Sequence, residues 1–262
     1  MITFMNSGRL GRFGNQMFQY ASLMGIAKKL GYDYGVNYSN KHHEEGLHFL
    51  LPDVFEKLSA KDCSNHFPQN YLREPTWEFN EYMFTIPDNT DILGYFQSEK
   101  YFEHCKDDVA KEFTFKQEIE EKIQSKRKQI SDPVISLHIR LGDYKNYPTK
   151  FPIPDINYYK QGLEHLPKDV PIYIFSDEPN EAKNIFSSLN KNVSVIEGQK
   201  NWEDMCLMKM CEWHIIANSS FSWWGAWLAN SKQVIAPKKW FGLDPEMPPN
   251  WDCIYCKNWI II

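Results

Sequence analysis

Residues that could bind an anionic substrate follow a predicted buried strand in the stretch His138-Ile139-Arg140-Leu141-Gly142-Asp143-Tyr144. The apolar run 134–139 is typical of such a strand. A guanidinium is planar and permanently charged, so Arg140 could bind a phosphate through two parallel hydrogen bonds. An ion pair between Arg140 and Asp143, beside a core His138, is an equally good interpretation of the residues alone.

Two further segments place hydroxyls and a carboxylate where strands are predicted to end. Ser176-Asp177-Glu178-Pro179 follows the predicted strand 172–175, and Ser219-Ser220-Phe221-Ser222 follows the predicted strand 213–217. Hydroxyls at a helix N-terminus favour an anion, and a carboxylate could accept hydrogen bonds from a nucleobase or ribose. Plain helix caps are the alternative for both segments. Doubly wound sheets bind ligands at the carboxyl ends of their strands, so all three segments belong to one candidate site.

A glycine-rich loop near the N-terminus adds a fourth segment. Residues 8–16 contain three glycines, two arginines and an Asn-Gln pair. Glycines let backbone N–H groups approach phosphate oxygens closely, and the arginines add positive charge. The spacing matches neither a P-loop nor a dinucleotide-binding fingerprint, so the loop by itself is a weak indicator.

The elements that must position these residues alternate along the second half of the chain. Strands are predicted, with helices between them, at 134–139, 172–175, 193–196, 213–217 and 234–237. Alternating strands and helices predict an α/β fold with a parallel sheet covered on both faces.

The first half is less regular. A short apolar run at 2–5 precedes a helix predicted over 17–30. Residues 37–100 contain four prolines and little periodicity, so short helices and loops are expected there rather than a regular sheet. A charged helix over 116–130 precedes Asp132-Pro133, which predicts domains of residues 1–131 and 132–262.

Composition excludes several classes of protein. A chain of 262 residues with 42% hydrophobic and 15% aromatic residues can bury a large core, which excludes intrinsic disorder. A net charge of −5 argues against a nucleic-acid partner. The chain contains neither an apolar run long enough for a membrane span nor a signal peptide at its N-terminus, so a cytoplasmic protein is expected.

Neither a metal nor a cofactor is expected. Cys206, Cys211, Cys253 and Cys256 could be imagined as a zinc site, but the first pair has the wrong spacing for a zinc knuckle, which favours buried thiols. No D-x-D pair follows a predicted strand. Arginine and helix dipoles would therefore neutralise a phosphate in place of a divalent ion.

Together the four segments resemble the bacterial α1,2-fucosyltransferases, glycosyltransferase family 11. The stretches Gly11–Ala21, His138–Tyr144, Phe175–Glu178 and Ser219–Trp224 are similar to four motifs of that family and stand in the same order. The resemblance implies a GT-B fold, with two facing Rossmann-like domains and parallel sheets. It further implies that the C-terminal domain binds GDP-fucose and that the N-terminal domain presents the acceptor.

The resemblance also implies roles for single residues. Arg140 would bind the pyrophosphate, Asp177 would lie near the nucleoside, and Asp143 is the first candidate for the catalytic base. Leu141 stands where the family motif has a second arginine. The candidate catalytic residues are Asn15, His138, Arg140 and Asp143. The candidate donor-binding residues are Arg12, Gly14, Ser176, Asp177, Ser219, Ser220 and Ser222.

The function implied is an inverting, metal-independent transfer of L-fucose from GDP-fucose to a hydroxyl, the 2-OH of a terminal galactose on a surface glycan. The alternatives are another linkage, another GDP-sugar, or a non-catalytic protein that only binds sugar nucleotides or glycans. GDP-fucose and a galactose-terminated glycan are the expected partners. The apolar tail 259–262 could pack into the fold or mediate peripheral association with membrane-bound glycan-assembly machinery.

Overall fold

The chain folds as two compact units. The computed structural model describes residues 1–39, 48–127, 133–189 and 192–262. One unit comprises residues 1–116 and 250–256, and the other comprises residues 117–249 and 257–262. The predicted boundary between residues 131 and 132 lies outside the described residues. The continuous part of the first unit ends at Lys116, just before the charged helix α4 (Gln117–Arg127).

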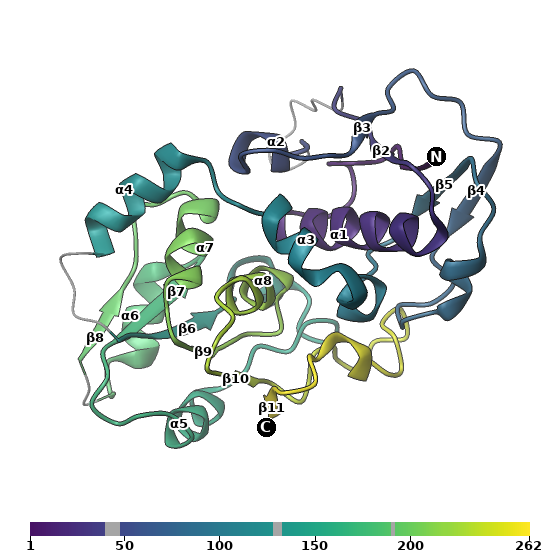
Figure 1. The fold of residues 1–262 in the computed structure, drawn as a ribbon. Helices are drawn as coiled ribbons and strands as arrows, with labels where there is room; N and C mark the ends of the chain where they lie inside the picture. Colours follow the sequence, from purple (N-terminus) through teal and green to yellow (C-terminus); the bar gives the residue numbers. More distant parts are fainter. Residues whose placement is uncertain (40–47, 128–132, 190–191) are drawn as a thin grey trace. The chain divides into compact units, whose positions relative to one another are not determined.

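The first unit is built on a parallel five-stranded sheet (Figure 1). Its strands are β1 (Ile2–Phe4), β2 (Tyr34–Val36), β3 (Lys61–Asp62), β4 (Asn70–Arg73) and β5 (Thr90–Leu93). They lie in the order β3-β2-β1-β5-β4, and every adjacent pair is parallel. The short helices expected within 37–100 are present, but the expectation that the segment adds no strands to a regular sheet was wrong. Strands of two to four residues are too short to show a period in the sequence, and tertiary pairing creates them.

Helix α1 (Phe13–Leu30) packs against this sheet and is buried over most of its length. It begins four residues before the predicted start, so Gly14 and Asn15 belong to its first turn. Gly31 ends it in the left-handed conformation. The remaining helices of the unit are α2 (Leu51–Val54), α3 (Lys106–Glu112) and the 3-10 turns η1 (Glu81–Thr85), η2 (Glu99–Tyr101), η3 (Glu103–Cys105) and η5 (Asp252–Ile254).

The second unit contains a parallel six-stranded sheet. Its strands are β6 (Ile135–Ile139), β7 (Ile172–Ser176), β8 (Val193–Val195), β9 (Trp213–Ile215), β10 (Gln233–Ala236) and β11 (Ile260–Ile261). The order is β11-β10-β9-β6-β7-β8, with every adjacent pair parallel. The predicted strands at these positions and the α/β class are confirmed. The two-residue β11 shows that the apolar tail pairs with β10 of its own chain.

The described residues of the second unit form the helices α4 (Gln117–Arg127), α5 (Ile156–Glu164), α6 (Pro179–Phe186), α7 (Asn201–Lys209) and α8 (Ser220–Leu228). Helix α4 precedes β6, and the other four connect successive strands from β6 to β10. A short 3-10 turn, η4 (Gly142–Asn146), follows β6. Helix α4 belongs here because Ile119 and Ile123 are buried and the helix packs on α7. Lys209 and Glu120 pair across the two helices at 3.0 Å.

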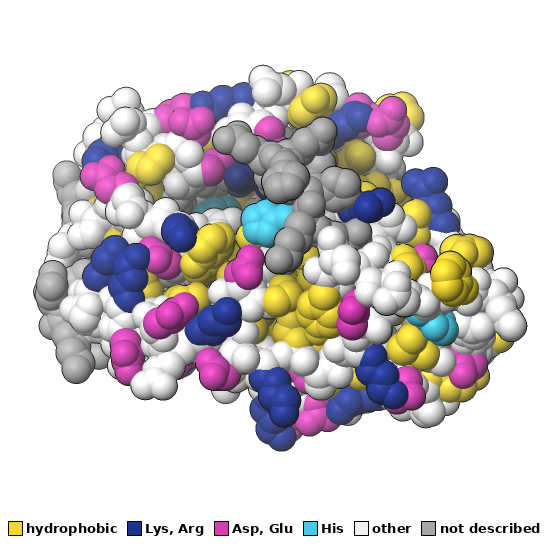
Figure 2. Space-filling view, turned by 90° about the horizontal axis from the view of Figure 1, so that it is seen from above, with side chains coloured by type: hydrophobic (Ala, Val, Ile, Leu, Met, Phe, Trp, Pro, Cys, Tyr) yellow, Lys and Arg dark blue, Asp and Glu magenta, His cyan; other side chains and the backbone are white. Residues whose placement is uncertain are grey.

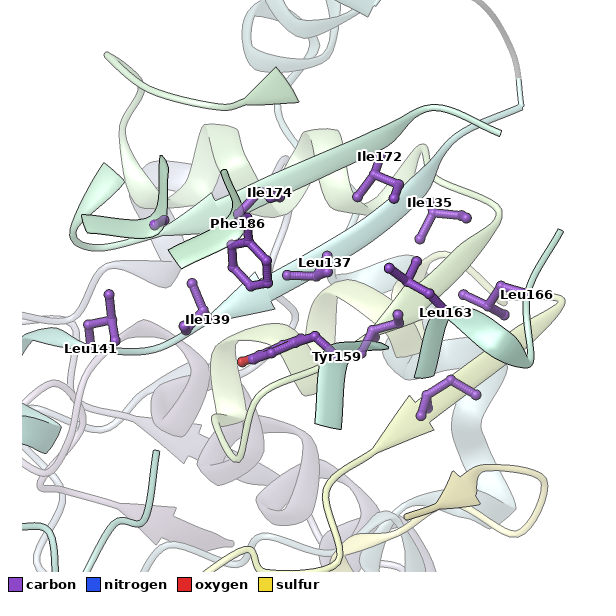
Figure 3. Packing of buried hydrophobic residues seen from close by; sticks show 13 residues of the cluster. Ile135, Leu137, Ile139, Leu141, Tyr159, Leu163, Leu166, Ile172, Ile174 and Phe186 are labelled. Atoms are coloured by element: carbon purple, nitrogen blue, oxygen red, sulfur yellow. The ribbon is translucent and has the colours of Figure 1, made fainter. Parts of the chain in front are cut away.

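Alternation along β6 separates the two faces of the second sheet. Ile135, Leu137 and Ile139 lie in one apolar cluster with Tyr159 and Leu163 of α5 (Figure 3). Side chains alternate across a strand, so Ser136 and His138 lie on the opposite face. The ring of His138 lies 5.4 Å from that of Phe221 in α8, which shows that α8 covers this opposite face. Ile135, Leu137 and Ile139 therefore belong to the apolar cluster on one face, while Ser136 and His138 lie on the face that α8 covers.

Charge on the surface is mixed. On the face shown in Figure 2, lysine and arginine side chains are interspersed with aspartate and glutamate side chains. That pattern differs from the continuous basic stripe that a nucleic-acid backbone attracts. Across the residues that the structure describes, no helix combines the length and the apolar character needed to span a membrane.

The apolar cluster under β6 predicts that alanine substitutions at two leucines will affect the free energy of unfolding to different extents. Leu137 is fully buried and Leu243 is 97% exposed. Leu137→Ala should lower the free energy of unfolding by about 2–5 kcal/mol, because it leaves a cavity in the core. Leu243→Ala should change it by less than about 0.5 kcal/mol. Urea denaturation measures both, and an equal effect of the two substitutions would contradict the packing described.

Candidate active site

Three of the predicted site segments meet at the carboxyl end of the second sheet. Strand β6 lies between β7 and β9, so the chain segments that follow these strands are neighbours. The Tyr144 hydroxyl donates a hydrogen bond to the Asn218 carbonyl at 3.0 Å, which ties η4 to the start of α8. The Leu141 N–H donates to Asp177 Oδ1 at 2.9 Å, which ties the end of β6 to the end of β7.

Arg140 is held between two carboxylates. One guanidinium nitrogen lies 2.8 Å from Asp177 Oδ2, and another is hydrogen-bonded to Asp143. The guanidinium also lies 5.4 Å from the centre of the Tyr144 ring. The side chain of Arg140 is 17% exposed, against 24% for Asp177 and 43% for Asp143. The structure thus contains the ion pair that the sequence left open, with a second carboxylate added.

A close backbone approach supports this arrangement at Gly142. A Cβ at this position would collide with Asp177 Oδ2, the oxygen that pairs with Arg140. A side chain at residue 142 would therefore push the carboxylate off the guanidinium. The sequence analysis placed Asp177 near a nucleoside, and its contacts here are to Arg140 and the Leu141 N–H.

His138 lies inside the sheet–helix interface and not in solvent. It is buried, and its Nδ1 has no hydrogen-bond partner among the described residues. Burial, with a smaller contribution from the charge of Arg140, lowers the pKa of His138 to about 3. The imidazole is therefore neutral at physiological pH and adds no positive charge to the site.

The hydroxyls at the start of α8 have different environments. Ser219 is the N-cap, and its Oγ accepts the Phe221 N–H at 3.3 Å. Ser222 is fully buried, and its hydroxyl donates to the Ala217 and Ser219 carbonyls. Ser220 is partly exposed in the first turn. At the end of β7, Ser176 Oγ accepts the Glu178 N–H at 3.0 Å, in the manner of a helix cap.

Leu141, where the family motif has a second arginine, is buried in the apolar cluster of the second unit. Arg140, one residue before, is partly exposed. The two successive residues thus point to different sides. The end of β6 therefore provides one arginine, Arg140, and the side chain of Leu141 lies in the core.

In the first unit the structure places the three predicted residues at the start of α1. Arg12 is the exposed residue before the helix, Gly14 is buried in its first turn, and Asn15 is half-buried. Asn15 Oδ1 accepts a hydrogen bond from Gln97 Nε2 at 2.8 Å. Gly11, with φ +75°, lies against the Asn15 side chain so closely that a Cβ would collide with it. The loop is thus shaped around Asn15.

Sequence reasoning missed two polar groups near this loop, Gln97 and Glu74. Glu74 follows β4 directly and accepts the Tyr95 N–H at 2.7 Å. Burial raises its pKa to about 7, although the N–H groups of Tyr95 and Phe96 oppose the shift. Nothing local marks this residue, which precedes Pro75 in an aperiodic stretch. Only the parallel pairing of β4 with β5 brings it beside Tyr95.

All six cysteines lie within the described ranges, and none of them is in a disulfide. Over those same ranges, no three His, Cys, Asp or Glu side chains gather where they could hold a metal ion. Cys206 is buried in α7 of the second unit, whereas Cys253 and Cys256 lie in the first unit. The cysteine pairs are thus placed in separate units.

Two units, each built on a parallel sheet with helices, have the architecture of the GT-B fold. The family model described as glycosyl transferase family 11 matches residues 4–262, so the chain belongs to this family. An α-1,2-colitosyltransferase of Escherichia coli is 30% identical, over 88% of this chain and 90% of that protein. The galactoside α-(1,2)-fucosyltransferase 1 of Alouatta belzebul is 24% identical, over 92% of this chain and 75% of that protein.

A solved structure has the same fold. The NodZ α-1,6-fucosyltransferase, in crystals soaked with GDP-fucose, superposes with a TM-score of 0.60 at 15% sequence identity. The match covers 95% of this chain and 96% of that one. The fold and family predicted from the four segments are therefore confirmed.

The low pKa of His138 predicts a pH-dependent stability. The folded pKa of about 3 lies below the unfolded value of about 6.5, so only the unfolded chain binds this proton between those values. The free energy of unfolding should therefore fall on acidification, by about 2 kcal/mol between pH 7 and pH 5 from this group. Urea denaturation of wild type and His138→Gln at both pH values isolates the contribution.

The matched control is His165→Gln, because His165 is exposed. His165→Gln should keep the wild-type pH dependence of the free energy of unfolding, whereas His138→Gln should reduce that dependence. If His138→Gln leaves it unchanged, the His138 imidazole is not held neutral in the folded protein.

Proposed function

We propose that this glycosyltransferase transfers L-fucose from GDP-fucose to the 2-OH of a terminal galactose on a surface glycan, with inversion at the anomeric carbon. The names of two relatives support the α-1,2 linkage, and one of them names a galactoside acceptor. The structural neighbour soaked with GDP-fucose supports the donor. Membership of glycosyltransferase family 11 supports the reaction class.

The observation that carries the proposal is the position of Arg140. A partly exposed guanidinium stands at the carboxyl end of a central parallel strand, where α/β sheets bind nucleotides. It lies beside the segment that begins α8, whose dipole favours an anion. A donor diphosphate would find its strongest charge-assisted hydrogen bonds there.

The charge balance of the cluster indicates how a diphosphate would enter. Arg140 carries one positive charge, and Asp143 and Asp177 carry two negative charges between them. A diphosphate would be repelled unless one carboxylate leaves the guanidinium. Asp177 is the less exposed of the two and also accepts the Leu141 N–H, so we assign it to orient Arg140. Asp143 is more exposed and lies in a short 3-10 turn, so we assign it to give way.

The reaction then follows from these roles. The acceptor hydroxyl oxygen attacks the anomeric carbon from the face opposite GDP, and the bond from that carbon to the β-phosphate oxygen breaks. The electron pair of that bond leaves with GDP, and Arg140 and backbone N–H groups stabilise the resulting charge. The hydroxyl proton passes to a base, for which a released Asp143 carboxylate is our candidate. His138 would shape the site as a neutral, buried ring.

The remaining donor-binding assignments belong to the same proposal. Ser220 and Ser219 would contact the phosphates from the start of α8, and Ser176 would line the donor site beside Asp177. The buried Ser222 hydroxyl is bonded within the helix start, which favours a role in shaping that turn. Arg12 and Gly14 are the donor-binding candidates of the first unit, and Asn15 is its candidate catalytic residue. Arg140 would supply the charge that other transferases take from a divalent ion, so we propose a metal-independent enzyme.

A colitosyl donor is the second candidate. The relative that matches at 30% identity is named a colitosyltransferase, and it covers most of both chains. The residues around Arg140 would bind the diphosphate of either donor. Comparing the rates of GDP release from the two GDP-sugars in one assay therefore identifies the sugar donor.

The test is GDP release from GDP-fucose and from the GDP derivative of colitose, with and without lactose, in the presence of EDTA. Wild type should release GDP in an acceptor-dependent way. Arg140→Ala should lower kcat about 10²–10³-fold, because it removes the main stabilising charge. The kcat of Arg140→Lys should lie between those of wild type and Arg140→Ala, because lysine keeps the positive charge but lacks the planar guanidinium.

Lys183→Ala is the matched control. It removes a cation from the same unit that pairs with Glu197 at 2.8 Å, outside the cluster around Arg140. Its rate should equal that of wild type. Wild-type activity in Arg140→Ala would contradict the proposed donor site, and loss of activity in EDTA would contradict a metal-independent reaction. GDP binding without release on any acceptor would favour a protein that only binds.

A further inference from the structure

A second group of side chains that could bind a ligand lies in the first unit, at the carboxyl ends of β4 and β5. The two strands pair in parallel up to Arg73 and Leu93, and the Glu74 N–H donates to the Leu93 carbonyl at 2.7 Å. The segments that begin at Glu74 and Gly94 therefore leave the same edge of the sheet. Parallel sheets bind ligands at this edge.

Two aromatic rings are stacked at this edge. The rings of Trp77 and Tyr95 lie 4.9 Å apart with planes 21° from parallel. Both side chains are half-buried, in contrast to the fully buried aromatic residues of the core. An indole and a phenol each combine flat apolar ring faces with a polar tip.

The Glu74 carboxylate lies directly beside the pair. It accepts the Tyr95 N–H at 2.7 Å and the Phe96 N–H at 3.1 Å, so it fixes the backbone that carries the Tyr95 ring. Gly94 has no Cβ, and one would collide with the Glu74 side chain. These hydrogen bonds use three of about four acceptor positions on the carboxylate, which leaves one on Oε1 for a ligand hydroxyl.

The next residue has an unusual backbone. Phe96 has φ +50°, a left-handed conformation that costs energy for a residue with a Cβ, and its ring is fully buried. Its carbonyl accepts hydrogen bonds from Ser22 Oγ and from the Ser98 N–H, which hold this conformation. Strained residues held in this way cluster at binding sites. On either side of Phe96, Gln97 Nε2 donates to Asn15 Oδ1 at 2.8 Å and the Tyr95 ring stacks on Trp77.

We propose that Trp77, Tyr95 and Glu74 form the acceptor subsite, in which the apolar face of a terminal pyranose lies against the stacked rings and a hydroxyl donates to the Glu74 carboxylate. The ligand class follows from the chemistry of the group. A pyranose combines an apolar C–H face with a rim of hydroxyls, and here a flat aromatic surface adjoins one carboxylate acceptor. Because the sugar is the acceptor of the transfer, this inference rests on the proposed function.

The experiment compares the lactose KM, the rate of GDP-fucose hydrolysis without acceptor, and the GDP affinity in wild type and variants. Trp77→Ala should raise the lactose KM at least tenfold and leave hydrolysis and GDP affinity within twofold. Trp77→Phe should recover most of the acceptor affinity, because it keeps a flat ring. Glu74→Gln should raise the lactose KM, since its amide nitrogen cannot accept hydrogen bonds.

Matched controls separate this role from stability. Tyr71 in β4 is 74% exposed, and Trp202 lies in the second unit, so Tyr71→Ala and Trp202→Ala should keep the wild-type KM. Glu81→Gln is the control for Glu74→Gln, because Glu81 is an exposed carboxylate of the same unit. Thermal unfolding establishes that each variant is folded.

Three outcomes bear on the proposal. A wild-type KM in folded Trp77→Ala and Glu74→Gln would overturn the subsite and leave the proposed function standing. Parallel losses of acceptor and GDP affinity would mean that the residues only support the fold, which also overturns the proposed subsite.

If wild type transfers to no acceptor, the proposed function fails. Saturation-transfer NMR with methyl β-galactoside then decides the subsite: a signal lost in Trp77→Ala supports it, and no wild-type signal overturns it.

Discussion

The pairing of one arginine with two carboxylates at the end of β6 is the constraint on which the second unit depends. Arg140 and its partners bind the ends of β6 and β7 to each other, and the Asp177 carboxylate lies so close to residue 142 that only glycine fits there. A partly buried guanidinium needs such partners, because an unpaired charge is costly to remove from water. The same pairing keeps the cation in place for an anion, at the edge of the sheet where parallel strands bind nucleotides.

The two units contribute different chemistry. The second unit supplies charge, with Arg140 beside the start of α8 and a neutral His138 underneath. The first unit supplies aromatic surface and amides, with Trp77 and Tyr95 stacked and Asn15 bonded to Gln97. In the proposed reaction the enzyme binds a charged diphosphate and a neutral sugar. A cation in the second unit, and stacked rings beside the Glu74 carboxylate in the first unit, suit those two substrates, and each group lies at the carboxyl edge of its own sheet.

The sequence predicted the second unit better than the first. Strands such as 135–139 are long, apolar and followed by polar residues, so both the strands and their functional ends are visible in the sequence. Asp177 was found as a strand-end residue, but its pairing with Arg140 depends on the neighbourhood of β6 and β7. In the first unit, β3 has two residues and β4 four, too few to show a period. Glu74 was missed for that reason, because only the pairing of β4 with β5 brings it beside Tyr95.

In the proposed reaction, Asp143 occupies the place on Arg140 that a donor diphosphate takes. Calorimetric titration of GDP into wild type and Asp143→Asn tests it directly. Removing the competing negative charge should tighten GDP binding while the rate of transfer falls, because the candidate base is lost as well. Weaker GDP binding in a folded Asp143→Asn would contradict the account, since the carboxylate would then support the donor site instead of competing for it.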